Sequence, residues 1–86
     1  MKKDLSKEEI EDLEYIALEV FNYFVENAGL GSYRDTIYPK ALKKTVLWFL
    51  AENPHLGNVS PAFMVKFGRV KKLREWVDAA RQGEGL

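Results

Sequence analysis

Apolar residues in the first third of the chain recur with the spacing of an α-helix. They fall at positions that share one side of such a helix: Ile10, Leu13, Ile16, Ala17, Val20, Phe21 and Phe24. Ser6 and Glu9 fit a capping box in front of this pattern, in which the serine hydroxyl accepts from the Glu9 amide. A glycine follows the pattern, at Gly29 or Gly31. The sequence therefore predicts one long amphipathic helix followed by a glycine stop.

Prolines mark both ends of a second predicted helix. A polar connection runs from Leu30 to Tyr38, and Pro39 then suits the first helical position, where its missing N–H costs nothing. The helix must end near Asn53, because Pro54 disfavours helical backbone in the residue before it. Its apolar positions are Leu42, Thr45, Val46, Phe49 and Leu50, with Leu47 and Trp48 alongside. We expect this helix over residues 40–52.

Two shorter helices follow. Ser60 and Pro61 repeat the combination of a cap and a proline at the first helical position, and Gly68 breaks this third helix. A fourth helix is expected over residues 69–82, before Gly83. Its inward positions are Val70, Leu73, Val77 and Ala80. No segment alternates apolar and polar residues convincingly, so we expect no sheet.

These elements predict an all-α fold, a small four-helix domain with one long N-terminal helix and a compact three-helix C-terminal unit. We divide this single domain into residues 1–38 and residues 39–86. A chain of 86 residues buries only a little over about 60% of its unfolded surface, so the core should be thin. The 11 aromatic residues exceed what such a core readily hides, and their types are enriched at protein interfaces. We therefore expect a homo-oligomer, formed through the wide apolar face of the first helix.

The composition leaves little for catalysis or metal binding. There is no cysteine, and His55 is the single histidine, so disulfides are excluded and a zinc site is not expected. Ser32, Thr36 and Ser60 lack the histidine and acid that would activate them, and no glycine-rich phosphate loop is present. We expect no enzymatic activity, no cofactor and no metal, and we interpret His55 as a surface loop residue. Without a signal peptide or an apolar run of membrane-spanning length, a cytoplasmic protein is expected.

Charges balance overall but are divided along the chain. Residues 1–30 carry three lysines against eight acids, whereas residues 31–86 carry ten basic residues against five acids. This division indicates either internal pairing in an antiparallel fold or opposite faces for two partners. A basic cluster lies where the third helix meets the fourth: Lys66, Arg69, Lys71, Lys72 and Arg74. It supports DNA contact as an alternative, although the pI near 6.6 is lower than a dedicated DNA-binding domain would have.

An ordered motif occupies the junction between the second and third helices. An apolar helix end is followed by Asn-Pro-x-Leu-Gly, Ser-Pro, an apolar helix and a glycine break, through Trp48, Asn53, Pro54, Leu56, Gly57, Ser60, Pro61 and Gly68. Over about residues 41–82 the chain resembles the toxin-binding domain of the Xre/MbcA/ParS-like antitoxins. Two positions depart from the family pattern. Asn58 replaces a second glycine, although asparagine tolerates a left-handed backbone, and Phe49 replaces a leucine.

The resemblance implies a non-catalytic antitoxin-like module whose partner is a RES-type, NAD-consuming toxin. In that family the C-terminal region lies at or in the toxin's active-site cleft, so the fourth helix and tail would occlude it here. The candidate partner-binding residues are Arg69, Lys72, Arg74, Trp76, Arg81, Gln82, Glu84 and Leu86. Residues 1–38 hold a helix and a loop in place of a DNA-binding helix-turn-helix. The alternatives are a DNA-associated regulator that uses the Lys66–Arg74 region and a stand-alone interaction or scaffold protein.

Overall fold

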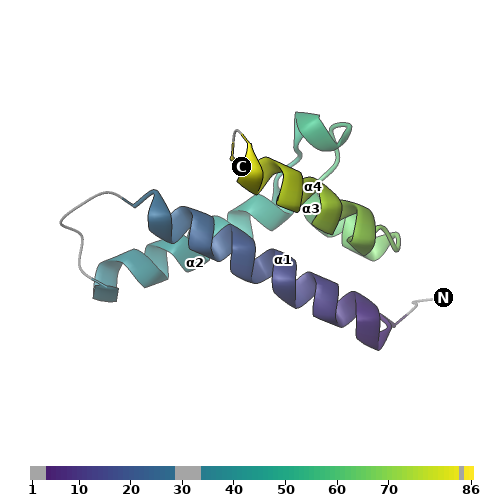
Figure 1. Ribbon diagram of the computed structural model, residues 1–86, viewed down its shortest axis with the longest axis horizontal. Coiled ribbons are helices and arrows are strands. Elements are labelled where there is room, and N and C mark those ends of the chain that lie inside the picture. The colour runs from purple at the N-terminus through teal and green to yellow at the C-terminus, as the bar shows by residue number, and fades with distance from the viewer. Residues whose placement is uncertain (1–3, 29–33, 84) are drawn as a thin grey trace.

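The computed structural model describes residues 4–28, 34–83 and 85–86, and these form a helical domain (Figure 1). The long helix α1 (Lys7–Glu26) is followed by α2 (Arg34–Leu50), by α3 (Pro61–Lys66) and by α4 (Val70–Gln82), with a 3-10 turn η1 (Pro54–Leu56) between α2 and α3. Within the described ranges the only bridge of the strand type is an isolated one, between Asn53 and Val59. The predicted all-α class is therefore confirmed.

The predicted capping box begins α1. The Glu9 amide donates to Ser6 Oγ at 3.0 Å, and the Ser6 amide donates to Glu9 Oε1 at 2.9 Å. The helix ends at Glu26, and Asn27 closes its last turn by donating from both its amide and its side chain to the Tyr23 carbonyl. This cap precedes the glycines that we expected to stop the helix. Gly29 and Gly31 themselves lie outside the described residues.

The expected start of the second helix is wrong by six residues, because α2 begins at Arg34 and not at residue 40. The segment that we predicted as a polar connection is helical from Arg34, so Pro39 lies inside α2 and the division at 38/39 falls within a helix. Proline interrupts one backbone hydrogen bond there. The turn before it is held by packing instead, since the Tyr38 ring contacts Phe21 of α1 with centroids 5.9 Å apart. At its other end α2 stops at Leu50, two residues before the expected position.

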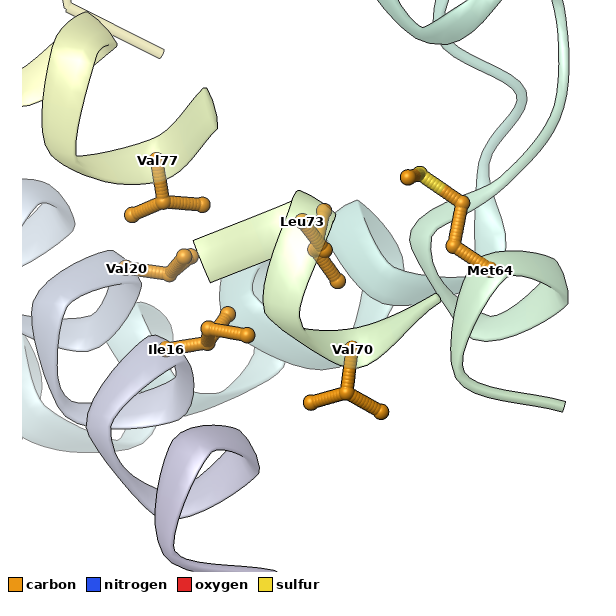
Figure 2. Close-up of a cluster of buried hydrophobic side chains, with 6 residues drawn as sticks. All are labelled: Ile16, Val20, Met64, Val70, Leu73 and Val77. Atoms are coloured by element: carbon orange, nitrogen blue, oxygen red, sulfur yellow. The ribbon is translucent and has the colours of Figure 1, made fainter. Parts of the chain in front are cut away.

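The core lies where α4 packs along α1. Figure 2 shows Ile16 and Val20 of α1 facing Leu73 and Val77 of α4, with the other core side chains around them. The fully enclosed side chains of this cluster are Ile16, Val20, Val70, Leu73 and Val77, and Met64 of α3 is nearly so. The inward positions predicted for the fourth helix are thus confirmed for Val70, Leu73 and Val77.

The helix pairing differs from the antiparallel arrangement that we considered. Helices α1 and α4 run in the same direction, as Figure 1 shows, and their contacts keep a nearly constant offset along the sequence. Lys71 meets Glu8 and Arg74 meets Asp12, at sequence separations of 63 and 62. Helix α2 instead runs back along α1 in the opposite direction. The acidic first helix and the basic last helix therefore face each other within one subunit.

The apolar stripe of α2 is only partly covered. Ala41 and Thr45 are buried, whereas Leu42, Val46 and Leu50 are at least half exposed. The apolar face of α1 is largely used inside the subunit through Ile16 and Val20, so the broad self-association surface that we expected on α1 is not available as a whole. What remains exposed on that helix is mainly Leu18 and Ile10.

Candidate protein-binding site

Asn53 organises the corner between α2 and α3. Its side-chain Oδ1 accepts from the His55 amide at 2.9 Å, which caps η1. Its carbonyl accepts from the amides of Leu56 and Asn58, each at 3.0 Å, and its own amide donates to the Val59 carbonyl. One residue therefore satisfies most of the backbone groups of this turn, which explains why an Asn-Pro pair marks the corner.

The backbone of the corner needs residues that accept left-handed conformations. Gly57 has φ +80° and Asn58 has φ +64°, which confirms the prediction that asparagine at this position tolerates such a backbone. The chain then enters α3 through Ser60, whose Oγ accepts from the Phe63 amide at 3.0 Å, and through the buried Pro61. The chain thus forms a fixed bend, in which Asn53, Gly57, Asn58 and Ser60 have identifiable backbone roles.

The bend brings His55 against α4. The His55 ring stacks on Trp76 with centroids 6.1 Å apart, and Trp76 in turn stacks on Trp48 at 6.4 Å. Both tryptophans are partly buried, and the Trp48 indole N–H is enclosed without a hydrogen-bond partner in the described chain. Three aromatic rings from α2, the corner and α4 therefore form a continuous column, here called the aromatic column.

A shallow cavity of about 310 Å³ opens beside the aromatic column. Its lining combines two ring faces with small residues at the C-terminal end of α4: His55, Trp76, Ala79, Ala80, Gly83 and Gly85. No large side chain from these positions fills the space, because four of the six are alanine or glycine. The cavity is of a size and character to receive one or two side chains of another protein.

His55 is the one ionisable side chain among the described residues that line the cavity. The described part of the lining adds no hydroxyl, thiol or carboxylate side chain that the imidazole would activate. A search of the described residues finds no cluster of three metal-binding side chains. Nor does any described helix combine the length and apolarity needed to cross a membrane.

Two of the candidate partner-binding residues are already paired with α1. Arg74 donates from its terminal nitrogen to Asp12 Oδ1 at 2.6 Å, and its guanidinium lies 4.0 Å from the centroid of the Tyr15 ring. Arg81 donates to Glu19 at 3.3 Å and in bidentate fashion to Glu26 at 2.9 and 3.1 Å. The guanidinium of Arg81 lowers the pKa of Glu26 by this hydrogen bonding. Both arginines join helices within the subunit.

Three of the remaining candidates lie on one side of α4. Arg69, Lys72 and Trp76 share one side by helical spacing, together with the cavity residues Ala79 and Gly83. Arg69 and Lys72 are exposed and take part in no ion pair among the described residues. This outward side of α4 is here called the outer α4 face. It faces away from the residues that pair with α1.

The tail folds back onto its own subunit. The Gly85 amide donates to the Ala80 carbonyl at 2.7 Å, and Leu86 is half-buried against the core cluster. Gly85 also lies so close to Tyr23 that a Cβ at this position would come within 2.9 Å of the ring. Gln82 is exposed, and Glu84 lies outside the described residues. The described part of the tail is therefore anchored rather than extended.

The basic cluster is also divided. Lys71 pairs with Glu8 at 3.1 Å, which raises the pKa of the lysine, and Arg74 pairs with Asp12. Lys66, Arg69 and Lys72 stay exposed without ion pairs among the described residues. Two of the five basic groups thus serve the α1–α4 contact, which leaves a smaller positive surface than the sequence indicated.

Sequence reasoning missed the role of His55 and of the small residues. We interpreted His55 as a surface loop residue, and it is exposed, but it also lines the cavity and stacks on Trp76. A usable signal was present in Ala79, Ala80 and Gly83, which follow Trp76 at helical spacing and are too small to cover it.

Comparison of the chain with protein-family models, with curated proteins and with solved structures finds no match.

Proposed function

We propose that this chain is a non-catalytic protein-binding module that receives its partner at the aromatic column and the outer α4 face. The observation that carries the proposal is the fixed corner, which holds His55 over Trp76 beside an open cavity of about 310 Å³. A corner of this kind specifies backbone geometry from Asn53 to Ser60, and it places the ring of His55 against another ring rather than against a nucleophile. Its consequence is a shaped surface at the C-terminal end of α4.

The chemistry of this surface fits a macromolecular partner. Partly exposed aromatic rings supply large contact areas, and tryptophan and arginine are prominent among the side chains that dominate binding energies. The cavity gives such a contact a socket, and the exposed Arg69 and Lys72 lie on the same side of α4. These two cations favour a partner with acidic groups next to an apolar protrusion.

The partner that we propose is a RES-type, NAD-consuming toxin, on the strength of the resemblance of the corner motif to the antitoxin family. Neutralisation would follow from occlusion, with α4 and the adjoining tail covering the toxin's active-site cleft. Because Leu86 and Gly85 pack against their own subunit, the outer α4 face and Gln82 are the parts best placed to make first contact. Arg74 and Arg81 support this face by fixing α4 on α1.

Filling the cavity tests this proposal directly. The chain is co-expressed with a RES-type toxin, and both co-purification and cellular NAD are measured. Ala79→Arg places a long side chain in the cavity from an exposed position. We expect it to weaken toxin binding at least about thirtyfold, the factor that corresponds to the loss of one dominant interface side chain. NAD should then fall as in cells with the toxin alone.

Ala51→Arg is the matched control, because Ala51 is also exposed but does not line the cavity. It should bind and neutralise like the unmodified chain. Equal binding by Ala79→Arg and the unmodified chain would reject the cavity as the binding site. Failure of the unmodified chain to bind or neutralise the toxin would reject the antitoxin proposal.

A further inference from the structure

The exposed apolar side chains of α2 form a continuous stripe. Tyr38, Leu42, Val46 and Leu50 recur every four residues, and each is close to half exposed or more. Residues four apart lie on one side of a helix, so the stripe runs for about 18 Å along α2. Monomeric domains rarely leave such a continuous apolar surface in water.

The same surface continues onto α1. Leu18 is 61% exposed and lies about 200° around the helix from the fully buried Ile16, on the side away from α4. The contact between Phe21 and Tyr38 joins the two helices. Since α4 packs against the Ile16 side, Leu18 and the α2 stripe lie together on the opposite side of the α1–α2 pair, here called the α1–α2 face. It is distinct from the cavity beside α4.

Charges on the α1–α2 face are divided between its two helices. Lys43 is exposed beside the stripe on α2, about 60° around the helix from Val46, whereas Glu11 and Glu14 are exposed near Leu18 on α1. None of these three groups belongs to the ion pairs of the described residues, in contrast to the acids of α1 that meet α4. A cation therefore flanks the apolar stripe of α2, and two acids flank Leu18 on α1.

We infer that a second copy of this chain covers the α1–α2 face, with α1 of each copy lying against α2 of the other. A two-fold arrangement brings the same patch of both copies together. It would bury both apolar stripes and set the acids of one α1 opposite Lys43 of the other α2. The result is a four-helix interface built from α1 and α2, which leaves both outer α4 faces free.

Sedimentation equilibrium of the full chain tests the apolar part of this proposal. We expect a reversible dimer at about 100 μM, a concentration that populates complexes of micromolar affinity. Leu42→Glu places a charge in the middle of the stripe and should raise the dimer dissociation constant at least about thirtyfold. Phe67→Glu is the matched control, because Phe67, the residue that caps the end of α3, is similarly exposed, at 56% against 58%, but lies outside the face. It should dimerise like the unmodified chain.

Charge reversal tests which helices meet. With α1 against the partner's α2, either Lys43→Glu or Glu14→Lys alone should weaken the dimer, and the two changes in one chain should restore it. If α2 instead lay against the partner's α2, the two Lys43 side chains would face each other. Lys43→Glu would then replace two facing cations with two facing anions and would not weaken the dimer. Circular dichroism of each variant verifies that the helices are retained.

A chain that stays monomeric at about 100 μM would overturn the proposal, even if the face then bound an acidic helix of another protein. So would a dimer that Phe67→Glu disrupts and Leu42→Glu does not. Dimers unaffected by either single charge reversal would reject the pairing of α1 with α2. The dimer is measured without toxin, so its failure and the failure of toxin binding are separate results.

Discussion

The carboxylate of Asp12 and the guanidinium of Arg74 lie 2.6 Å apart and connect the first helix to the last. Asp12 is only 7% exposed, so this contact is shielded from water on one side. The ion pair between Glu8 and Lys71, one turn earlier, joins the same two helices but is open to solvent, with both side chains more than 70% exposed. Both pairs join a carboxylate of α1 to a cation of α4 at nearly the same sequence offset, and they differ in burial.

This difference predicts unequal effects of removing each acid. Asp12→Ala should lower the free energy of unfolding clearly, because a shielded charged hydrogen bond is lost and Arg74 must be solvated again. Glu8→Ala should have little effect, since exposed pairs contribute little to stability and are screened by salt. Urea unfolding of both variants checks the order. Equal losses would show that burial of Asp12 does not strengthen its contact.

Truncation of Leu73 should be among the most damaging core changes. This α4 side chain is fully enclosed in the core cluster, which also contains residues of α1 and α3. Leu73→Ala therefore leaves a cavity and should cost about 2–5 kcal/mol of unfolding free energy. Met64→Leu conserves volume at the edge of the same cluster and should cost less than about 1.5 kcal/mol. Denaturant unfolding measures both. A loss below about 1 kcal/mol for Leu73→Ala would contradict the described core.

Alkaline pH should weaken the contact between Tyr15 and Asp78. The Tyr15 hydroxyl donates to Asp78 Oδ1 at 2.6 Å, and this hydrogen bond raises the pKa of the tyrosine. A phenol with a raised folded-state pKa contributes stability that is fully present below its unfolded pKa of about 10 and is lost as pH rises through the folded value. Stability of the unmodified chain relative to Tyr15→Phe should therefore decline above about pH 10.

Ultraviolet absorbance of tyrosinate provides the site-specific measurement. Asp78→Asn removes the negative acceptor and should return the Tyr15 titration towards lower pH. Two chains are titrated, one carrying Asp78→Asn and one carrying both Asp78→Asn and Tyr15→Phe. The difference between their absorbance curves is the titration of Tyr15. An unchanged Tyr15 titration in the Asp78 variant would contradict the assigned cause.

The corner should be sensitive to its glycine for backbone reasons alone. Gly57 has φ +80°, and a Cβ there would meet no atom within 4 Å. Gly57→Ala should nevertheless cost about 1–2 kcal/mol, the strain of a left-handed backbone in an L-residue. Asn58→Gly, also at positive φ, is the control and should change stability by no more than about 1 kcal/mol. Thermal unfolding distinguishes the two.

The anchored tail should detach when Gly85 gains a side chain. Its φ is +92°, and an added Cβ would lie 2.9 Å from a Tyr23 ring carbon. Gly85→Ala should therefore release Leu86 from the core while the four helices are retained. Faster removal of the C-terminal residue by carboxypeptidase, at unchanged helical circular dichroism, is the expected result. Gly68→Ala also has positive φ but open space, and its tail should digest at the original rate.

Much of the fold was predictable because its helix ends carry local signals. The capping box at Ser6 and the Ser60–Pro61 start are short-range features that depend on little else. The start of α2 was not predictable in this way. Pro39 fits both the first position of a helix and an interior position near its N-terminal end. The contact between Phe21 and Tyr38 supports the helix that begins earlier, at Arg34, and a local sequence pattern does not reveal this contact.

The site was less predictable because long-range pairing decides which α4 side chains remain available. From sequence, Arg74 and Arg81 looked as free as Arg69 and Lys72. Only the parallel packing of α4 on α1 separates them, since it brings Arg74 to Asp12 and Arg81 to Glu19 and Glu26. The cavity likewise arises where the corner meets α4: the small residues after Trp76 indicate one of its walls, but the position of His55 opposite them depends on packing.

Mapping the bound surface by NMR tests the central claim most directly. The isotope-labelled chain is titrated with an inactive variant of the RES-type toxin, and amide and indole shifts are followed. We predict that the largest changes occur at the cavity, at the His55, Ala79 and Gly83 amides and the Trp76 indole N–H, while the α1–α2 face changes little. Saturating toxin that shifts no cavity signal, or that shifts only Leu42, Val46 and their neighbours, would contradict the account.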